Sequence, residues 1–231
     1  MANVPVAMTL FCSDGTEIPL YIASVAEGTE SNLTTSTQSN FTVSASAVGT
    51  AFAGKSIVAS TPALATNGFA YAYLLRAGQI INVFPVGVAG AVSESRMELC
   101  SATTLIAGDQ VRVMTNTAAD RECALSVYTN KGRYHIFAIT PSTGATNQLV
   151  SILTGNGIGT TLQGENLIKC LCTSVDGIKL APSGMGVYVV DDKNSIVGAM
   201  VATAPASAQS FYDTVNIPIN LNYQAQAITS A

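Results

Sequence analysis

Apolar and polar residues alternate along most of this chain, in short runs separated by turn signals. The first two runs are Val6–Cys12 and Glu17–Val25, and Ser13-Asp14-Gly15-Thr16 lies between them. An Asp-Gly turn between two alternating runs is a strong signal for a β-hairpin. The pattern therefore predicts that the chain opens with two antiparallel strands.

Similar runs continue to the C-terminus and predict further strands. Their ranges are Phe41–Val48, Phe69–Leu75, Gln79–Val88, Ser95–Cys100, Gln110–Thr115, Cys123–Thr129, Arg133–Thr140, Leu149–Leu153, Asn166–Ser174, Gly177–Ala181, Met185–Val190, Ser195–Ala202 and Phe211–Tyr223. Residues 27–40 and 59–68 are expected to be connections. No segment predicts a convincing helix, since the best candidate, Ala202–Phe211, is short and contains Pro205.

Many short strands with turns between them indicate an all-β protein. We expect an antiparallel sandwich, jelly-roll-like in form, with little or no helix. A chain of 231 residues can form one β domain. We therefore expect a single domain over residues 1–231. A second possibility stays open: an N-terminal hairpin or arm of residues 1–66, followed by a main sandwich of residues 67–231.

Leu75–Val83 and Leu105–Val113 share a local pattern in which an Ala-Gly turn leads into an alternating run. This pattern resembles the way strands begin in jelly-roll modules, such as tumour-necrosis-factor-like heads and many capsid domains. The resemblance implies a jelly roll and says nothing about activity. The sequence indicates no internal duplication beyond this echo.

Charged side chains are scarce, at 10% of the chain, with 10 Lys and Arg and 14 Asp and Glu. A typical soluble domain has about 25%. Small uncharged residues take their place, and these lose little side-chain entropy on burial. The charges tend to fall beside predicted turns, as at Asp14, Asp109 and Asp176. The strand faces are thus nearly neutral, and we expect them to be covered by other subunits.

Three classes of partner or location are disfavoured by the same composition. The net charge is −4, and the densest basic stretch, with Lys131, Arg133 and His135, is interrupted, whereas direct nucleic-acid binding normally needs a clustered positive patch. No apolar window reaches the roughly 18–20 residues of a membrane span. Met1–Pro5 lacks the basic start of a secretory signal. We expect synthesis in a cytosol, without secretion.

The five cysteines are Cys12, Cys100, Cys123, Cys170 and Cys172. An odd number in a chain made in a cytosol predicts free thiols, buried as small apolar groups. Cys170 and Cys172 occupy alternate strand positions, so both should face the same side. A metal centre would need more ligands, and the chain contains one histidine.

Candidate chemistry is sparse. A Ser-His-Asp or Cys-His site would have to use His135, and no G-x-S-x-G motif is present, so we expect a surface or interface histidine. Asp191, Asp192 and Asn194 offer oxygens for a calcium ion, but turn capping explains them as well, and cation binding stays open. Residues 155–159 fail the dinucleotide and phosphate-loop patterns and predict a flexible loop. No catalytic, cofactor-binding or metal-binding residue is predicted, and an enzyme is not expected.

The composition is that of an extracellular protein, yet the chain shows no export signal and its thiols are unpaired. Particles that assemble inside a cell and leave by lysis require this combination. We expect a virion structural protein, a capsid or capsid-decoration subunit, with a tail-tube protein ranked third. Its partners would be copies of itself in a symmetric assembly and other virion proteins. The alternatives are a lectin-like or receptor-binding sandwich and a hydrolase on a β scaffold.

Overall fold

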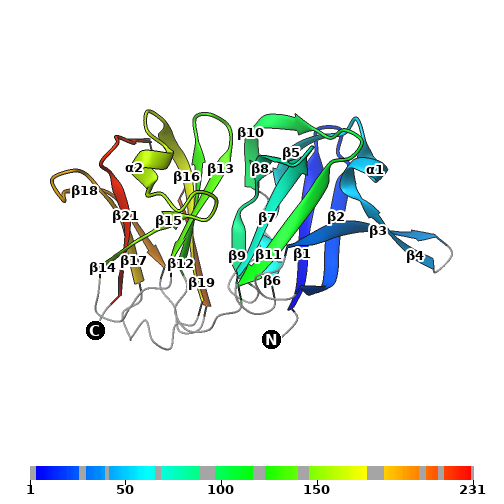
Figure 1. Ribbon diagram of the computed structural model, residues 1–231, viewed down its shortest axis with the longest axis horizontal. Coiled ribbons are helices and arrows are strands. Elements are labelled where there is room, and N and C mark those ends of the chain that lie inside the picture. The colour runs from blue at the N-terminus through cyan, green and yellow to red at the C-terminus, as the bar shows by residue number, and fades with distance from the viewer. Residues whose placement is uncertain are drawn as a thin grey trace. The chain divides into compact units, whose positions relative to one another are not determined.

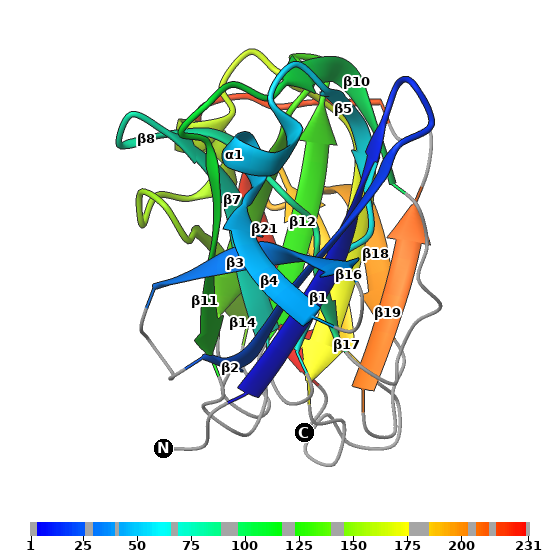
Figure 2. The same ribbon diagram turned by 90° about the vertical axis from the view of Figure 1, so that its right-hand side faces the viewer.

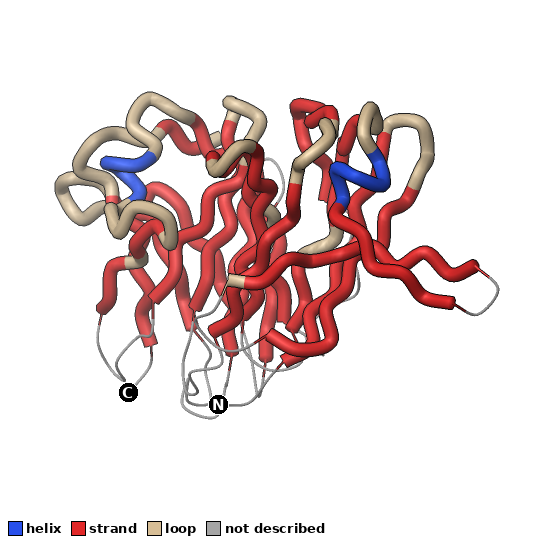
Figure 3. Tube along the Cα trace, turned by 45° about the vertical axis from the view of Figure 1, so that its right-hand side comes forward, coloured by secondary structure: helices blue, strands red, loops and turns tan. Residues whose placement is uncertain are grey.

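The computed structural model describes residues 4–25, 30–39, 42–65, 69–88, 97–116, 123–139, 146–175, 185–202, 207–212 and 216–229. Strands make up most of these residues, together with two short helices, α1 (Val48–Phe52) and α2 (Ile158–Thr161) (Figure 3). No helix among them is long and apolar enough to cross a membrane. The prediction of an all-β protein with little helix is confirmed.

Contacts along the chain divide it into two compact units. Unit 1 comprises Met1–Ala89 and Ser93–Thr117, and unit 2 comprises Gly90–Val92 and Ala118–Ala231. In unit 1, strands on both sides of residue 66 pair within one sheet. The domain boundaries expected from the sequence stay a prediction, and each unit is described by itself.

The described residues of unit 1 form eleven strands in one continuous sheet. They are β1 (Val4–Cys12), β2 (Glu17–Val25), β3 (Ser31–Ser39), β4 (Thr42–Ala47), β5 (Ser56–Ser60), β6 (Ala63–Ala65), β7 (Phe69–Arg76), β8 (Gln79–Val83), β9 (Val86–Val88), β10 (Met97–Thr104) and β11 (Gln110–Asn116). The main order is β10-β5-β1-β2-β3-β11-β7-β8, with antiparallel pairs throughout. β4 pairs with β3, and this hairpin projects from unit 1 in Figure 1. β6 pairs with β1 and, in parallel, with β9.

The opening hairpin shows how alternation becomes a buried face. Leu10 lies opposite Ile18 and both are fully buried, whereas Ala7 and its partner Tyr21 are exposed. Gly15 supplies the turn with φ 84°, a conformation that a side chain disfavours. The predicted hairpin is confirmed.

Unit 2 is an antiparallel sandwich of two sheets. Its strands are β12 (Cys123–Thr129), β13 (Tyr134–Ile139), β14 (Thr146–Gln148), β15 (Val150–Ser151), β16 (Asn166–Val175), β17 (Met185–Val190), β18 (Ile196–Ala202), β19 (Ser207–Tyr212), β20 (Ile217–Pro218) and β21 (Gln224–Thr229). One sheet has the order β15-β13-β12-β16-β19, with β20 on β16, and the other has the order β14-β21-β17-β18. The core lies between them, where Leu125 and Phe137 of the first sheet join Val187 and Ala225 of the second in one buried cluster. The sandwich is confirmed, and the jelly-roll form stays a prediction.

Several element boundaries differ from those expected. Ser31–Ser39 is a strand, because Leu33 and Thr35 turn into the core and its Thr residues suit a sheet. Ser207–Tyr212 is a strand paired with β16, and it lies in the segment that had been the best, though unconvincing, candidate for a helix. Pro218 lies in the short strand β20, which pairs only with β16 among the described strands, as its edge role predicted. The strand expected at Gly177–Ala181 lies outside the described residues.

The two units share one topology, which corrects the expectation that the chain contains no internal duplication. In both, the strands follow one another across the sheets in the same order. The equivalent elements are β1 and β12, β2 and β13, β3 and β14 with β15, α1 and α2, β5 and β16, β7 and β17, β8 and β18, β10 and β19 with β20, and β11 and β21.

The register and the turn hydrogen bonds repeat as well. Val111 pairs with Leu33 in unit 1, and in unit 2 the Leu149 amide donates to the Ala225 carbonyl at 2.8 Å. Around the helices, three hydrogen bonds from an amide to a carbonyl recur at equivalent residues. In unit 1 they run from Gly49 to Asp109 (3.0 Å), from Gly54 to Leu105 (2.8 Å) and from Leu105 to Lys55 (2.8 Å). In unit 2 the corresponding bonds run from Gly159 to Tyr223 (3.0 Å), from Gly164 to Ile219 (2.9 Å) and from Ile219 to Glu165 (2.9 Å). Each unit is thus one copy of the same scaffold.

A short sequence signal accompanies the duplication. Val48–Gly54 reads VGTAFAG and Ile158–Gly164 reads IGTTLQG, so both have the form [VI]-G-T-x-[FL]-x-G. The first residue of each is fully buried, and the last glycine has a positive φ, 87° at Gly54 and 77° at Gly164. The helix α1 lies at the same end of unit 1 as the turn between β10 and β11 (Figure 2).

Candidate functional site

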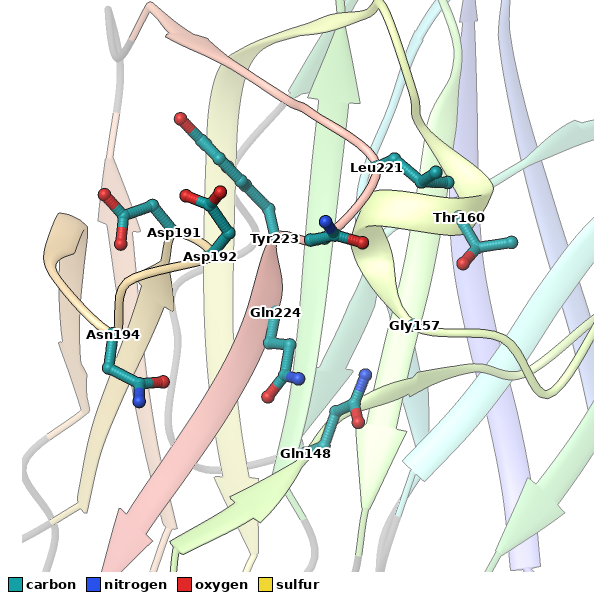
Figure 4. Close-up of a pocket in the computed structure, with 10 residues that line it drawn as sticks. Gln148, Gly157, Thr160, Asp191, Asp192, Asn194, Leu221, Tyr223 and Gln224 are labelled. Atoms are coloured by element: carbon teal, nitrogen blue, oxygen red, sulfur yellow. The ribbon is translucent and has the colours of Figure 1, made fainter.

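Unit 2 contains a pocket of about 410 Å³. Four segments form it: the end of β14, the first turn of α2, the turn between β17 and β18, and the turn that leads into β21. The lining residues are Gln148, Gly157, Thr160, Asp191, Asp192, Asn194, Leu221, Asn222, Tyr223 and Gln224 (Figure 4). A neighbouring hollow of about 390 Å³ shares Asp192 and residues 221–223 with it.

Two glycines allow the walls of the pocket to come together. A Cβ on Gly159 would lie 2.3 to 2.7 Å from the carbonyl oxygens of Asn220, Leu221 and Tyr223, so the main chain of α2 rests directly on that turn. A Cβ on Gly157 would lie 2.2 Å from Nε2 of Gln148. The glycine-rich stretch at residues 155–159, predicted to be a flexible loop, therefore forms part of the pocket wall and begins a helix.

The turn between β17 and β18 is capped by Asp191. Its Oδ1 accepts hydrogen bonds from the amides of Lys193 (2.8 Å) and Ser195 (2.7 Å), and Asn194 has a left-handed φ of 60°. This is the capping role considered for Asp191 from the sequence. Within the described ranges, no three or more His, Cys, Asp or Glu side chains lie together as a metal cluster.

Most polar side chains of the pocket have no partner in the described part of the protein. Asp192, Asn194 and Asn222 are exposed, and none of their side chains makes a hydrogen bond there. Gln224 is held, because its Oε1 accepts from Nε2 of Gln226 at 3.0 Å. Gln148 and Gln224 approach each other from neighbouring strands, and Tyr223 extends on the side of Asp192 (Figure 4). The pocket therefore contains both hydrogen-bond donors and hydrogen-bond acceptors that a ligand could use.

Unit 1 carries an ion pair at the equivalent position. By strand register, Arg76 corresponds to Asp191 and Asp109 to Tyr223. Arg76 donates from Nε and NH2 to the two Asp109 oxygens at 2.9 and 2.8 Å, and from NH2 to the Thr104 carbonyl at 2.7 Å. Burial raises the pKa of Asp109, but hydrogen bonds from Arg76 and from the Ile106 amide outweigh it and lower the pKa below its ordinary value.

His135 lies in β13, opposite Val127, and is half-buried. Its Nε2 is buried without a hydrogen-bond partner in the described protein. Burial is the main cause that lowers its pKa; Arg133 lowers it further and Glu165 opposes this. It does not line the pocket. No described hydroxyl or thiol group makes a hydrogen bond to the His135 ring.

Four cysteines are free and buried, as the sequence predicted: Cys12, Cys123, Cys170 and Cys172. The side chain of Cys100 lies outside the described residues. Cys170 and Cys172 both enter the core of unit 2, so they face the same side. Burial raises the pKa of Cys170 to about 12, and a hydrogen bond with Cys172 together with burial raises that of Cys123. These thiols fill the core.

The sequence singled out Asp191, Asp192 and Asn194, but not the residues of the turn before β21 that face them. Asn222, Tyr223 and Gln224 carry no motif of their own. The sequence signal that could have located these residues is the repeated [VI]-G-T-x-[FL]-x-G stretch. Its first glycine packs against the turn before β11 in unit 1 (Gly49) and against the turn before β21 in unit 2 (Gly159). No protein-family model matches the chain, and neither a curated protein nor a solved structure shows a match to it.

Proposed function

We propose that this chain is a structural subunit of a virion, a capsid or capsid-decoration protein, and that copies of it assemble through charge-poor strand faces. The observation that supports this most is the outward face of the hairpin formed by β1 and β2. Ala7, Pro19 and Ala23 are exposed there, and Tyr21 is 48% exposed. Glu17 is the one charged residue of these two strands. Covering such a face costs little desolvation of charge.

The edges of the sheets support the same proposal. Among the described strands, β8 and β18 lie at equivalent sheet edges, and each carries an exposed isoleucine at the matching position, Ile80 at 40% and Ile196 at 60%. Exposed edges with apolar side chains favour pairing with another chain. Because the scaffold is duplicated, one chain offers two versions of this edge, which suits repeated contacts in a closed, symmetric assembly.

The placement of charge agrees with this arrangement. Asp14 and Lys55 pair with each other at the turn end of unit 1, and Asp191, Asp192 and Lys193 occupy a turn of unit 2. Glu17 and Arg76 lie at strand ends beside turns, and Glu98, Arg112 and Lys169 are exceptions that lie inside strands. Charges at turns keep the subunit hydrated, while the faces between the turns stay neutral.

Electron microscopy and light scattering of the purified protein test the proposal. We expect symmetric particles or rings of fixed copy number. Tyr21→Glu places a second charge on this charge-poor face and should shift the population toward monomers, whereas Leu153→Glu, at a 45% exposed residue that is not part of the β1–β2 hairpin, should not. A monomer of the unaltered chain at high concentration would overturn the proposal.

The lectin-like or receptor-binding module remains the second candidate, favoured by the polar pocket of unit 2. Such a module works as a monomer or small oligomer. A fixed small stoichiometry at all concentrations, together with ligand binding, would favour it over the assembly proposal.

A further inference from the structure

We propose that the pocket of unit 2 binds a neutral polyhydroxylated ligand, one sugar unit of a glycan. This proposal does not depend on self-assembly of the chain. It rests on a comparison that the molecule itself provides, between two copies of one scaffold that differ at the same place.

In unit 1 that place holds a buried carboxylate and its ion pair. Asp109 is fully buried, and its carboxylate is held by the Arg76 guanidinium and by the Ile106 amide at 2.9 Å. In unit 2 the same two positions carry Asp191 and Tyr223, which cannot form this ion pair. These two positions line a cavity of about 410 Å³, within the range of roughly 300–1,000 Å³ typical of ligand sites.

The lining selects the kind of ligand. Gln148, Asn194, Asn222 and Gln224 provide amide N–H donors as well as carbonyl acceptors, and Asp192 provides carboxylate acceptors. A metal ion or an ammonium group would use acceptors only, and an anion would use donors only. A sugar hydroxyl donates and accepts, so a polyol can use both kinds of group.

Charge and shape point the same way. No lysine, arginine or histidine lines the pocket, and two carboxylates do, which disfavours phosphate, sulfate and acidic sugars. Tyr223 is half-buried against the core of unit 2 and adds a flat apolar surface with a hydroxyl at its end. Such a ring can cover the C–H face of a pyranose while neighbouring amides bind its hydroxyls.

The walls are fixed before any ligand arrives. The Gly159 amide donates to the Tyr223 carbonyl at 3.0 Å, and Asp191 holds the opposite turn through the Lys193 and Ser195 amides. A pre-formed site loses less conformational entropy on binding. Ligand pockets are usually largely pre-formed in this way.

Saturation-transfer NMR and titration calorimetry on the full-length chain test the proposal. The probes are the methyl glycosides of glucose, galactose and mannose and of N-acetylglucosamine, with methylguanidinium, calcium chloride and inorganic phosphate as the alternatives. We expect at least one neutral glycoside to bind with a dissociation constant of about 0.1–10 mM. The charged probes should show no saturable binding.

Two variants tie the binding to the pocket. Asp192→Ala and Asn222→Ala each remove an exposed side chain that holds no other part of the described protein, and each should weaken the glycoside by about tenfold. Lys193→Ala lies in the same turn but does not line the pocket and should leave binding unchanged. Circular dichroism confirms that the variants fold.

Three outcomes would overturn the proposal. These are no binding by any glycoside, glycoside binding that Asp192→Ala and Asn222→Ala leave intact, and saturable binding of calcium or methylguanidinium in place of the sugars. Each is distinguishable from failure of the assembly proposal, because particles are measured by size and the sugar site by titration.

Discussion

Replacing Gly159 by alanine perturbs the main-chain contact on which the pocket wall depends. The added methyl group would lie 2.3 Å from the Leu221 carbonyl oxygen, 2.6 Å from that of Tyr223 and 2.7 Å from that of Asn220. Real Cβ atoms do not approach backbone oxygens so closely, and none of these oxygens is the end of a flexible side chain. The turn before β21 must therefore move away from α2.

The magnitude follows from three contributions. Overpacking against fixed backbone costs about 1–3 kcal/mol, and weakening the hydrogen bond from the Gly159 amide to Tyr223 costs about 0.5–1.5 kcal/mol. Alanine recovers about 0.5–1 kcal/mol, because glycine loses more chain entropy on folding. We expect the free energy of unfolding to fall by about 0.5–4 kcal/mol, with a central value of about 2 kcal/mol. Gly49→Ala should cost a similar amount in unit 1, where the added Cβ would meet the Ile106 and Asp109 backbone at 2.4 to 2.8 Å.

Urea denaturation followed by circular dichroism measures this loss, and an unchanged m-value shows that the same surface is exposed on unfolding. Thr160→Ala is the matched control, since Thr160 is the exposed neighbour of Gly159, and its substitution should change the stability by no more than about 0.5 kcal/mol. If Gly159→Ala is as stable as the unaltered protein, the main-chain contact does not form the wall, and the reasoning is refuted.

Three further predictions concern buried polar groups. Asp109→Ala leaves Arg76 and the Ile106 amide without their acceptor and should lower the free energy of unfolding by about 2–3 kcal/mol. Asp14→Ala, which breaks the exposed ion pair with Lys55, should cost much less. Equal losses for the two variants would contradict this prediction. His135→Leu removes a buried unpartnered nitrogen and should be neutral or stabilising. Because burial lowers the pKa of His135 from 6.5, the folded protein binds this proton less readily than the unfolded chain, and the free energy of unfolding falls as the pH drops below 6.5. The variant should therefore lose less stability than the unaltered protein between pH 6.5 and 5; equal pH profiles from urea titrations would contradict this. Cys170, with a pKa of about 12, should resist a thiol reagent until urea unfolds the protein, and rapid labelling of the native protein would show that the thiol is accessible.

The strands that alternate cleanly could be predicted from the sequence. Every second residue turns into the core from Val6 to Cys12 in β1 and at Ile18 and Leu20 in β2, and the Asp14-Gly15 turn joins the two strands. Ser31–Ser39 was missed because its polar Ser and Thr side chains give no apolar period, and the neighbouring strands β2 and β11 impose the extended form on it. The helices α1 and α2 were missed for a similar reason. A single helical turn is too short to show a helical period.

The duplication escaped the sequence because the two copies differ at most core positions. The residue pair Leu33 and Val111 becomes Leu149 and Ala225, for example, with the same pairing but different volumes. The local echo between Leu75–Val83 and Leu105–Val113 compares segments that are not equivalent in the structure. From the sequence, Asp191, Asp192 and Asn194 were noticed as clustered oxygens that could cap a turn or hold a cation, but no site was predicted there. They are three of the ten residues that line the pocket, and the lining also includes a turn that only the tertiary fold brings near.

The contact at Gly159 has a consequence for how this protein can change over generations. Because main chain meets main chain there, the wall of the pocket does not depend on which side chains face the cavity. Asp192, Asn222 and Thr160 can be exchanged for other residues without loss of the scaffold, as happens in binding loops carried on rigid sheets. In unit 1 the equivalent positions, Arg76 and Asp109, are bound to each other, so the exposed side chains of unit 2 are the ones that can vary without breaking a buried ion pair.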